Sequence, residues 1–177
     1  AAIEAGIATQ FSPTEATMGL RELAQAGFNA QESMRLLIPV LDLAGGSLGE
    51  LSPQQAAGLA AQSMKAFGIS IDEAAISVDR MLQAVNVFAL NASELPLALG
   101  TASRGALSLN QSLSETLIAL GLVKNVVPGV ERASTAVAVA MERMVDPAVQ
   151  QSLKGLGVAV VDTKDRFRDF LDIIGDL

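Results

Sequence analysis

Apolar residues recur at helical spacing through most of this chain. An apolar side chain at every third or fourth position lines up along one face of a helix, and that face turns towards a core. The first such stripe joins Ala16, Leu20 and Leu23. The stripes cover residues 16–24, 34–41, 56–67, 75–89, 113–120 and 130–144, with a short helix expected at 93–103. The pattern therefore predicts a mainly α fold.

Helix-start signals precede two of these stripes. Ser12 and Ser52 each stand before a proline, and Glu15 or Gln55 follows at the third position. A hydroxyl and a carboxylate or amide at this spacing can satisfy the free N–H groups of a first helical turn, where proline also fits because it has no N–H. Ser12 and Ser52 are therefore predicted N-caps.

Glycines mark where the first helix of each pair stops. Gly27 and Gly68 are each followed by an apolar residue, and helices commonly end where a glycine takes a left-handed conformation and the next apolar residue folds back. New start signals come at once, at Asn29 after the first glycine and at Ser70, with Glu73 three positions on, after the second. Each glycine is thus expected to form the turn inside a pair of helices.

The start, stop and restart signals form a repeat. The first two copies lie 40 to 41 residues apart, and a looser third copy consists of Ser93, Gly105 and a restart at Ser108 to Gln111. A fixed period of this length is typical of stacked helix pairs. We expect antiparallel helix pairs that form one compact multi-helix domain over residues 1–177, since no low-complexity linker divides the chain.

Two local features depart from this regular pattern. Pro39 falls inside the second stripe and is expected to bend or end that helix, because proline removes a backbone donor and crowds the preceding turn. Near the C-terminus, the run from Gly157 to Asp162 predicts a short β-strand closed by a turn, although a four-residue apolar run also fits a helix by periodicity. A final helix is expected to carry Phe167 and Phe170.

Composition limits both the stability and the chemistry of such a domain. Half of the residues are hydrophobic, but alanine and leucine dominate them, and Phe, with six copies, is the only aromatic. Because burying a CH₂ contributes only ~0.8 kcal/mol, alanine-rich interfaces let helices approach closely but stabilise them little. The chain has no His and no Cys, which removes the commonest general base, the commonest metal ligand and any thiol or disulfide. We therefore expect neither a metal nor a cofactor.

The net charge of −7 argues against nucleic acid and anionic membrane as electrostatic partners, since phosphate binding depends on Lys and Arg. The glycine-turned helix pairs resemble helix-turn-helix DNA readers, but the second helices carry almost no positive charge. Arg35 alone lies between residues 30 and 44, and Arg80 alone between 71 and 90. No uncharged stretch reaches the roughly 20 apolar residues of a transmembrane helix.

The most specific catalytic pattern is the run Gly45 to Gly49, which matches the G-x-S-x-G turn that exposes a hydrolase serine, here Ser47. Its context does not fit, because no strand is predicted before it and no histidine is present to take the serine proton. Carboxylate pairs such as Asp72 and Glu73 are better explained by their favourable position at helix starts, near the positive end of the helix dipole. We expect no enzymatic activity.

Five segments, taken in order, resemble the core region of phage tail tape-measure proteins. The first runs from Leu20 to Met34 (LRELAQAGFNAQESM), and the next surrounds Pro39. The segments are residues 20–34, 36–44, 60–75 around Phe67-Gly68-Ile69, 106–112 leading into 117–120, and a closing segment made of Asp146-Pro147, 153–158 and 168–174. The resemblance extends over nearly the whole chain.

The resemblance implies a structural role in phage or prophage tail assembly, in which a tape-measure protein helps to set tail length and leaves ahead of the DNA at infection. It implies tail-tube subunits, assembly chaperones and baseplate proteins as partners, assembly in the bacterial cytoplasm, and a final place in the virion tail. Because Ala1 opens the chain without a start methionine, we expect a fragment of a longer protein. The alternative from the repeat alone is an α-solenoid adaptor or scaffold.

Overall fold

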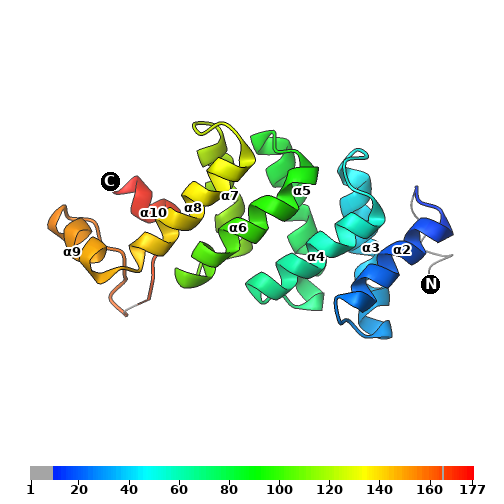
Figure 1. Cartoon of the computed structure of the whole chain (residues 1–177). Coiled ribbons are helices and arrows are strands. Elements are labelled where there is room, and N and C mark those ends of the chain that lie inside the picture. The colour runs from blue at the N-terminus through cyan, green and yellow to red at the C-terminus, as the bar shows by residue number, and fades with distance from the viewer. Residues whose placement is uncertain (1–9, 165) are drawn as a thin grey trace. The chain divides into compact units, whose positions relative to one another are not determined.

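The computed structural model describes residues 10–164 and 166–177, and it is mainly helical, as the sequence predicts (Figure 1). By its own contacts the chain divides into two compact units, one up to Pro96 and one from Leu97 onwards. The expectation of one domain over residues 1–177, like that of antiparallel pairing, stays a prediction.

The first unit contains two successive helix pairs. Its elements are α2 (Pro13–Gln25), α3 (Ala30–Gly46), α4 (Pro53–Phe67), a 3₁₀ turn η1 (Ile71–Glu73), α5 (Ala74–Phe88) and a second 3₁₀ turn η2 (Ala92–Glu94). Each α-helix of this unit therefore contains one of the predicted apolar stripes, and each connection within or between the pairs is short.

The two pairs of the first unit are stacked on each other. Besides the contacts inside each pair, α2 packs against α4, and α3 packs against both α4 and α5. Small residues allow this close packing: a Cβ added to Gly19 in α2 would lie 3.5 Å from the carbonyl oxygen of Pro53 at the start of α4. The core is leucine and alanine, with Leu23, Leu37, Leu41 and Ala56 almost completely buried.

Over its described residues, the second unit combines three helices of 12 to 15 residues with two shorter ones. α6 (Leu95–Ser108) starts just before it and provides its first helix. It continues with α7 (Leu113–Lys124), α8 (Val130–Met144), α9 (Pro147–Gly155) and α10 (Phe170–Gly175). α7 packs against α8 and is also covered by α10.

The predicted turn at Gly105 is wrong. α6 runs through Gly105 to Ser108, so this glycine ends no helix and Ser108 starts none. Gly105 is instead the point at which α6 meets α8, because an added Cβ would overlap the carbonyl oxygen of Ala138 and lie 2.8 Å from its Cα. A missing side chain that allows close packing gives the same sequence signal as a missing side chain that allows a turn.

The predicted strand from Gly157 to Asp162 is also wrong. Among the residues that the structure describes there is no strand, and this run makes one antiparallel bridge, between Val161 and Phe167. Two hydrogen bonds flank the bridge, from Arg168 N–H to Val160 O at 3.0 Å and from Asp162 N–H to Arg166 O at 2.8 Å. Pairing goes no further because Asp169 already caps α10.

Pro39 lies inside α3 without ending it. The helix continues to Gly46, and the residues on either side of the proline, Leu36, Leu37, Val40 and Leu41, are buried. Burial of this apolar face offsets the lost backbone hydrogen bond, which explains why the proline is tolerated.

We predict that Gly105→Ala destabilises the chain although alanine is the better helix former. The new methyl group would overlap the backbone of Ala138, and overpacking of this kind costs about 1–3 kcal/mol, more than the gain of roughly 1 kcal/mol from helix propensity. Gly58→Ala in α4 is the matched control, because its Cβ would meet nothing closer than Glu22 at 3.7 Å. Urea unfolding should show a loss for the first variant and no loss for the second; equal stabilities would contradict the close contact.

Candidate functional site

The predicted N-caps Ser12 and Ser52 open α2 and α4. Ser12 N–H donates to Glu15 Oε2 at 2.8 Å, and Glu15 N–H donates to Ser12 Oγ at 3.3 Å. Ser52 and Gln55 repeat this exchange at 2.9 and 3.3 Å. Each helix start is thus held by side chains within four residues of one another, with no help from the rest of the fold.

The second helix of each pair begins in two different ways. Asn29 forms a reciprocal pair with Glu32, at 2.8 and 3.0 Å, and opens α3 directly. Ser70 N–H donates to Glu73 Oε2 at 3.1 Å, but this contact opens the 3₁₀ turn η1, after which α5 starts at Ala74.

The turns inside both pairs are built on glycines with positive φ. Gly27 has φ 96°, and Gly68 lies in the left-handed region with φ 65° and ψ 30°. In each turn the next residue folds back onto the helix, since Phe28 N–H donates to Leu23 O at 3.2 Å and Ile69 N–H donates to Met64 O at 2.9 Å. This is the hydrogen bond expected of a glycine-ended helix.

Sequence reasoning missed the helix start at Ser112. Ser112 N–H donates to Glu115 Oε2 at 2.5 Å and Glu115 N–H donates to Ser112 Oγ at 3.3 Å, at the start of α7. The signal was present as Ser-x-x-Glu, but Ser108 to Gln111 fits the same template four residues earlier. Only the contact between α6 and α8 at Gly105 decides between the two.

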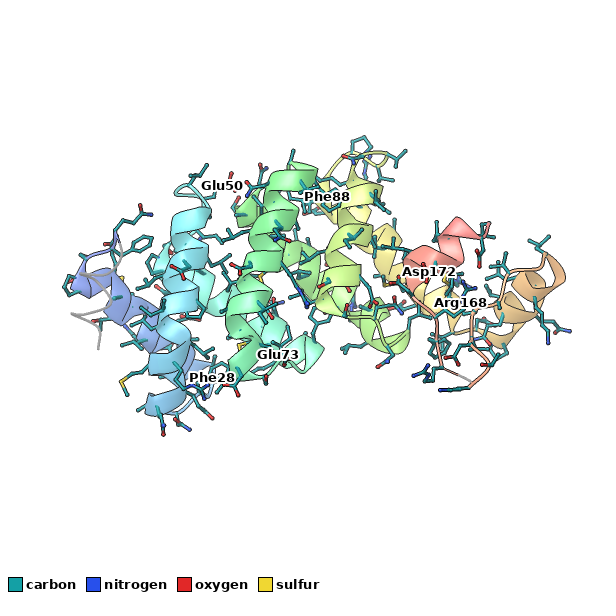
Figure 2. The ribbon with its side chains drawn as sticks, turned by 180° about the vertical axis from the view of Figure 1, so that it is seen from behind. Phe28, Glu50, Glu73, Phe88, Arg168 and Asp172 are labelled. Atoms are coloured by element: carbon teal, nitrogen blue, oxygen red, sulfur yellow. The ribbon has the colours of Figure 1, made fainter. Side chains whose placement is uncertain are left out.

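Polar contacts tie equivalent parts of successive pairs together. Near the glycine turns, Lys65 Nζ donates to Ala26 O at the end of α2, and Arg35 of α3 forms an ion pair with Asp72 of η1. Figure 2 shows Phe28 and Glu73 at this end of the first unit.

At the other end, where Figure 2 shows Glu50 and Phe88, Ser93 N–H donates to Glu50 Oε2 at 3.3 Å. These contacts join residues 37 to 43 positions apart, about one repeat.

Ser47, the serine of the G-x-S-x-G run, is a structural residue. Its side chain is buried, donates to Ala44 O at 2.7 Å and accepts from Leu51 N–H at 3.0 Å. Both hydroxyl contacts are therefore used to close the turn between α3 and α4.

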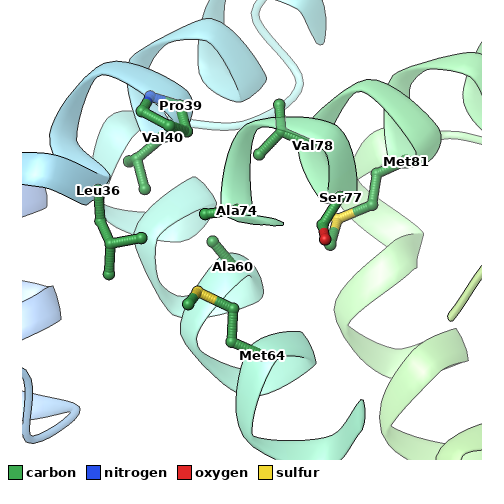
Figure 3. Close-up of a pocket in the computed structure, with 9 residues that line it drawn as sticks. All are labelled: Leu36, Pro39, Val40, Ala60, Met64, Ala74, Ser77, Val78 and Met81. Carbon is green, nitrogen blue, oxygen red and sulfur yellow. The ribbon is translucent and has the colours of Figure 1, made fainter. Parts of the chain in front are cut away.

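An apolar pocket lies between α3, α4 and α5 (Figure 3). Its lining includes Leu36 and Pro39 from α3, Met64 from α4, and Val78 and Met81 from α5. Its volume of about 10 Å³ is close to the space of a single water, so it offers no room for a cofactor. Among the described residues no group of three or more His, Cys, Asp or Glu side chains could hold a metal ion.

Gln111 anchors the C-terminal segment of the second unit. Its buried side-chain amide donates to Leu109 O at 3.0 Å and to Arg168 O at 3.1 Å, and its Oε1 accepts from Phe170 N–H at 2.7 Å. Phe170 and Ile173 then bury their side chains. One amide thus joins the turn before α7 to the start of α10.

Two aspartates have raised pKa values. Partial burial raises the pKa of Asp42 in α3, and the nearby charge of Asp79 in α5 raises it further. Partial burial also raises the pKa of Asp169, with an added contribution from Glu115. In contrast, hydrogen bonds from the backbone and side chain of Ser12 lower the pKa of Glu15.

No described helix is both long enough and apolar enough to cross a membrane. The arrangement as a whole consists of capped helices and short turns. The model of the family described as phage-related minor tail protein matches residues 1–177 of the chain. The chain belongs to this family.

The chain is also similar to a curated protein, the tape measure protein of Pneumococcus phage Dp-1. It is 32% identical to this chain over 163 residues, which is 91% of the chain. The match covers 14% of the relative's own length. No solved structure matches. The family match and this relative confirm the resemblance that the sequence segments indicate, and they make the chain a phage tail protein.

We predict that Gly68→Val destabilises this phage tail protein by roughly 1–3 kcal/mol, because a β-branched residue tolerates the left-handed conformation poorly. Nothing lies within 4 Å of an added Cβ, so the cost comes from the backbone alone. Gly68→Asn is the control, since asparagine enters this region more readily and should lose much less. A melting temperature unchanged by the valine would count against the turn.

We predict that Asp42→Asn stabilises the chain at neutral pH by a few tenths of a kcal/mol, a value that allows for solvent screening of a partly exposed pair. The raised pKa means that ionising Asp42 costs the folded state more than the unfolded state, so stability falls as pH rises through that pKa. The gain should therefore vanish at about pH 3, where aspartates are protonated in both states. Urea unfolding at the two pH values measures this; a gain of equal size at both would rule out the charge as its cause.

Proposed function

We propose that this chain is part of a tape-measure protein, which helps to set the length of the phage tail and leaves the tail ahead of the genome at infection. The observation that carries the proposal is the 32% identity to a tape measure protein over 91% of the chain. In this role the partners are tail-tube subunits that polymerise around the parent protein, assembly chaperones and baseplate proteins. The chain would be assembled in the host cytoplasm and end in the virion tail, with no direct binding of nucleic acid and no catalytic step.

The capped repeats are consistent with a length-setting role. A protein sets length by spanning it, and a helix rises 1.5 Å per residue whereas an extended chain rises roughly 3.3 Å. Turns at Gly27 and Gly68 separate the helices of the first unit, which pack against one another rather than forming one continuous helix. We propose that the chain is folded in antiparallel pairs before assembly and opens during it.

The side chains between the helices make such opening feasible. Four of the eight buried residues of α4 are alanines: Ala56, Ala57, Ala60 and Ala61. An alanine exposes little apolar area to water when its contact is lost. The helix caps, in contrast, bond within four residues and use no group from a neighbouring pair. Separation of the pairs would therefore remove the stacking contacts without breaking the cap contacts directly.

A second candidate is an α-solenoid adaptor, which the stacking of the first unit favours. α2 packs against α4 and α3 against α5, so each pair contacts its neighbour through equivalent helices, as in solenoid repeats. The parent gene distinguishes the two candidates. A gene of several hundred codons or more beside tail-tube genes supports the tape measure, and an isolated short gene supports the adaptor.

The test of the ruler is an in-frame deletion of residues 52–90, from the N-cap of α4 to the residue before Asn91, which removes 39 residues and one helix pair. Tails should shorten by ~58 Å if the opened chain is helical. They should shorten by roughly 130 Å if it is extended. Electron micrographs of mutant particles distinguish these lengths.

Duplication of the same 39 residues is the matched control, because it adds a complete pair and should lengthen the tail by the amount that the deletion removes. If the deletion blocks tail assembly, the tail length of the duplication mutant still tests the ruler. Intact tails of native length from the duplication would contradict the ruler and favour the adaptor or a folded role at one end of the tail.

A further inference from the structure

The last ten residues close over α7 with few contacts. They contain α10, which is six residues long, far below the length at which an isolated helix is stable in water. Only two of their side chains, Phe170 and Ile173, are buried. We call residues 168–177 the C-terminal latch.

The buried amide of Gln111 fixes the backbone of the C-terminal latch on either side of Asp169. It bonds to Arg168 O at 3.1 Å and to Phe170 N–H at 2.7 Å. Gln111 itself lies just before α7, the helix against which α10 packs, and Glu115 is in the first turn of α7. The starts of α7 and α10 therefore meet, and each brings one carboxylate.

Both carboxylates cap their own helix, but capping does not require their charge. Asp169 accepts a backbone N–H bond at 2.8 Å as the N-cap of α10, and Glu115 accepts one at 2.5 Å in the capping box of α7. Asparagine caps as well as aspartate, and glutamine serves in a capping box as glutamate does. The first unit uses Asn29 and Gln55 in these two roles. Two negative charges at this point are therefore more than the helix starts need.

The two carboxylates disfavour each other's charge. Partial burial raises the pKa of Asp169, and a bond from Leu171 N–H lowers it. The charge of Glu115 and a hydrogen bond with its side chain raise the pKa of Asp169 further. A like charge at close range makes ionisation of an acid less favourable, so the closed latch holds a proton at this pair more tightly than an open latch would.

The other charged residues of α7 and of the latch are placed elsewhere. Lys124 lies at the opposite end of α7, and Asp172 is exposed on α10. Arg168, labelled with Asp172 in Figure 2, bonds through Nη1 to Asp176 Oδ2 at 2.8 Å, near the end of the chain. Closing the latch thus brings two like charges together at Gln111.

We propose that the C-terminal latch closes against repulsion between Asp169 and Glu115, and that it opens locally while the rest of the second unit stays folded. Opening breaks the two distant bonds of Gln111 and uncovers Phe170 and Ile173, but it separates the like charges. Segments with few buried apolar contacts open at the lowest free energy. The inference does not rest on the proposed tape-measure function, because every contact that carries it lies within the second unit.

The experiment measures hydrogen exchange of the whole chain by mass spectrometry, with each rate expressed relative to that of an unstructured chain. The test variants are Asp169→Asn and Glu115→Gln, singly and together, because each keeps its cap and removes one charge. Asp172→Asn is the matched control, since it removes one charge from α10 but none from the pair. Gln111→Ala removes the amide that holds the latch.

At pH 7 either test variant should slow exchange in residues 168–177 by about two- to fivefold, the effect expected of one partly exposed charge pair. The double variant should gain no more than a single one, because the repulsion is lost once either charge is gone. Asp172→Asn should leave exchange unchanged or faster, since a carboxylate near a helix start is favourable. Gln111→Ala should speed exchange in the latch and leave the first unit unchanged.

The pH dependence follows from the sign of the shift. The raised pKa of Asp169 favours the closed latch at low pH, and this advantage is lost as pH rises through that pKa. Relative exchange of the native latch should therefore be slower at about pH 4 than at pH 7, where aspartates are ionised in the open state. Asp169→Asn should remove most of this difference.

Four results would overturn the inference. Unchanged or faster exchange in both single variants would show that the carboxylates hold the latch instead of opposing it. A gain in the double variant equal to the product of the single gains would show that they act independently. An equal gain in Asp172→Asn would assign the effect to net charge. An equal change in α7 and α8 would show that the second unit opens as a whole.

Discussion

Packing between successive helix pairs is the interaction on which the first unit depends. Its α-helices are 13 to 17 residues long, and helices of this length are marginal in water on their own. The stacking of α2 on α4 and of α3 on α5 buries the apolar stripes that would otherwise face solvent. Without a neighbouring pair, Leu36 and Val40 of α3 would lose the cover of α4 and α5, with which they line the apolar pocket. Each helix pair is therefore stabilised mainly by packing against another pair.

The residues at these contacts explain both the tight fit and its modest strength. An added Cβ would overlap the backbone of α8 at Gly105 but would only touch Pro53 O at Gly19, at 3.5 Å, and alanines fill much of the remaining interface. Close approach of this kind brings many weak contacts but removes little apolar surface from water. Such contacts give up little apolar area per residue when they separate, a property that suits a chain proposed to change form during assembly.

Local signals predicted much of the fold, and long-range contacts account for the errors. Ser12 and Ser52 could be read from four residues because their partners lie within the same turn. Gly105 could not, since its role depends on Ala138 in α8, 33 positions away in the sequence. The prediction of a strand after Gly157 failed for a similar reason. The apolar residues of this segment are buried within the second unit, and burial alone produces the apolar run of a strand even where no neighbouring strand pairs with it. Gln111 was predicted as part of a helix start, and no sequence signal marks its distant contacts, because both distant partners are backbone groups.

Gln111 also has a consequence for the timing of folding. Its amide can reach Leu109 O as soon as the turn before α7 exists, but Arg168 O and Phe170 N–H come 57 and 59 positions later in the chain. At a synthesis rate of about 5–20 residues per second, a ribosome needs roughly 3–12 s to supply them. During that interval the side chain must keep water as its partner, and α7 lacks the cover of α10. The second unit therefore closes only when its last residues have been made, whereas the stacked pairs of the first unit can form while synthesis is still under way.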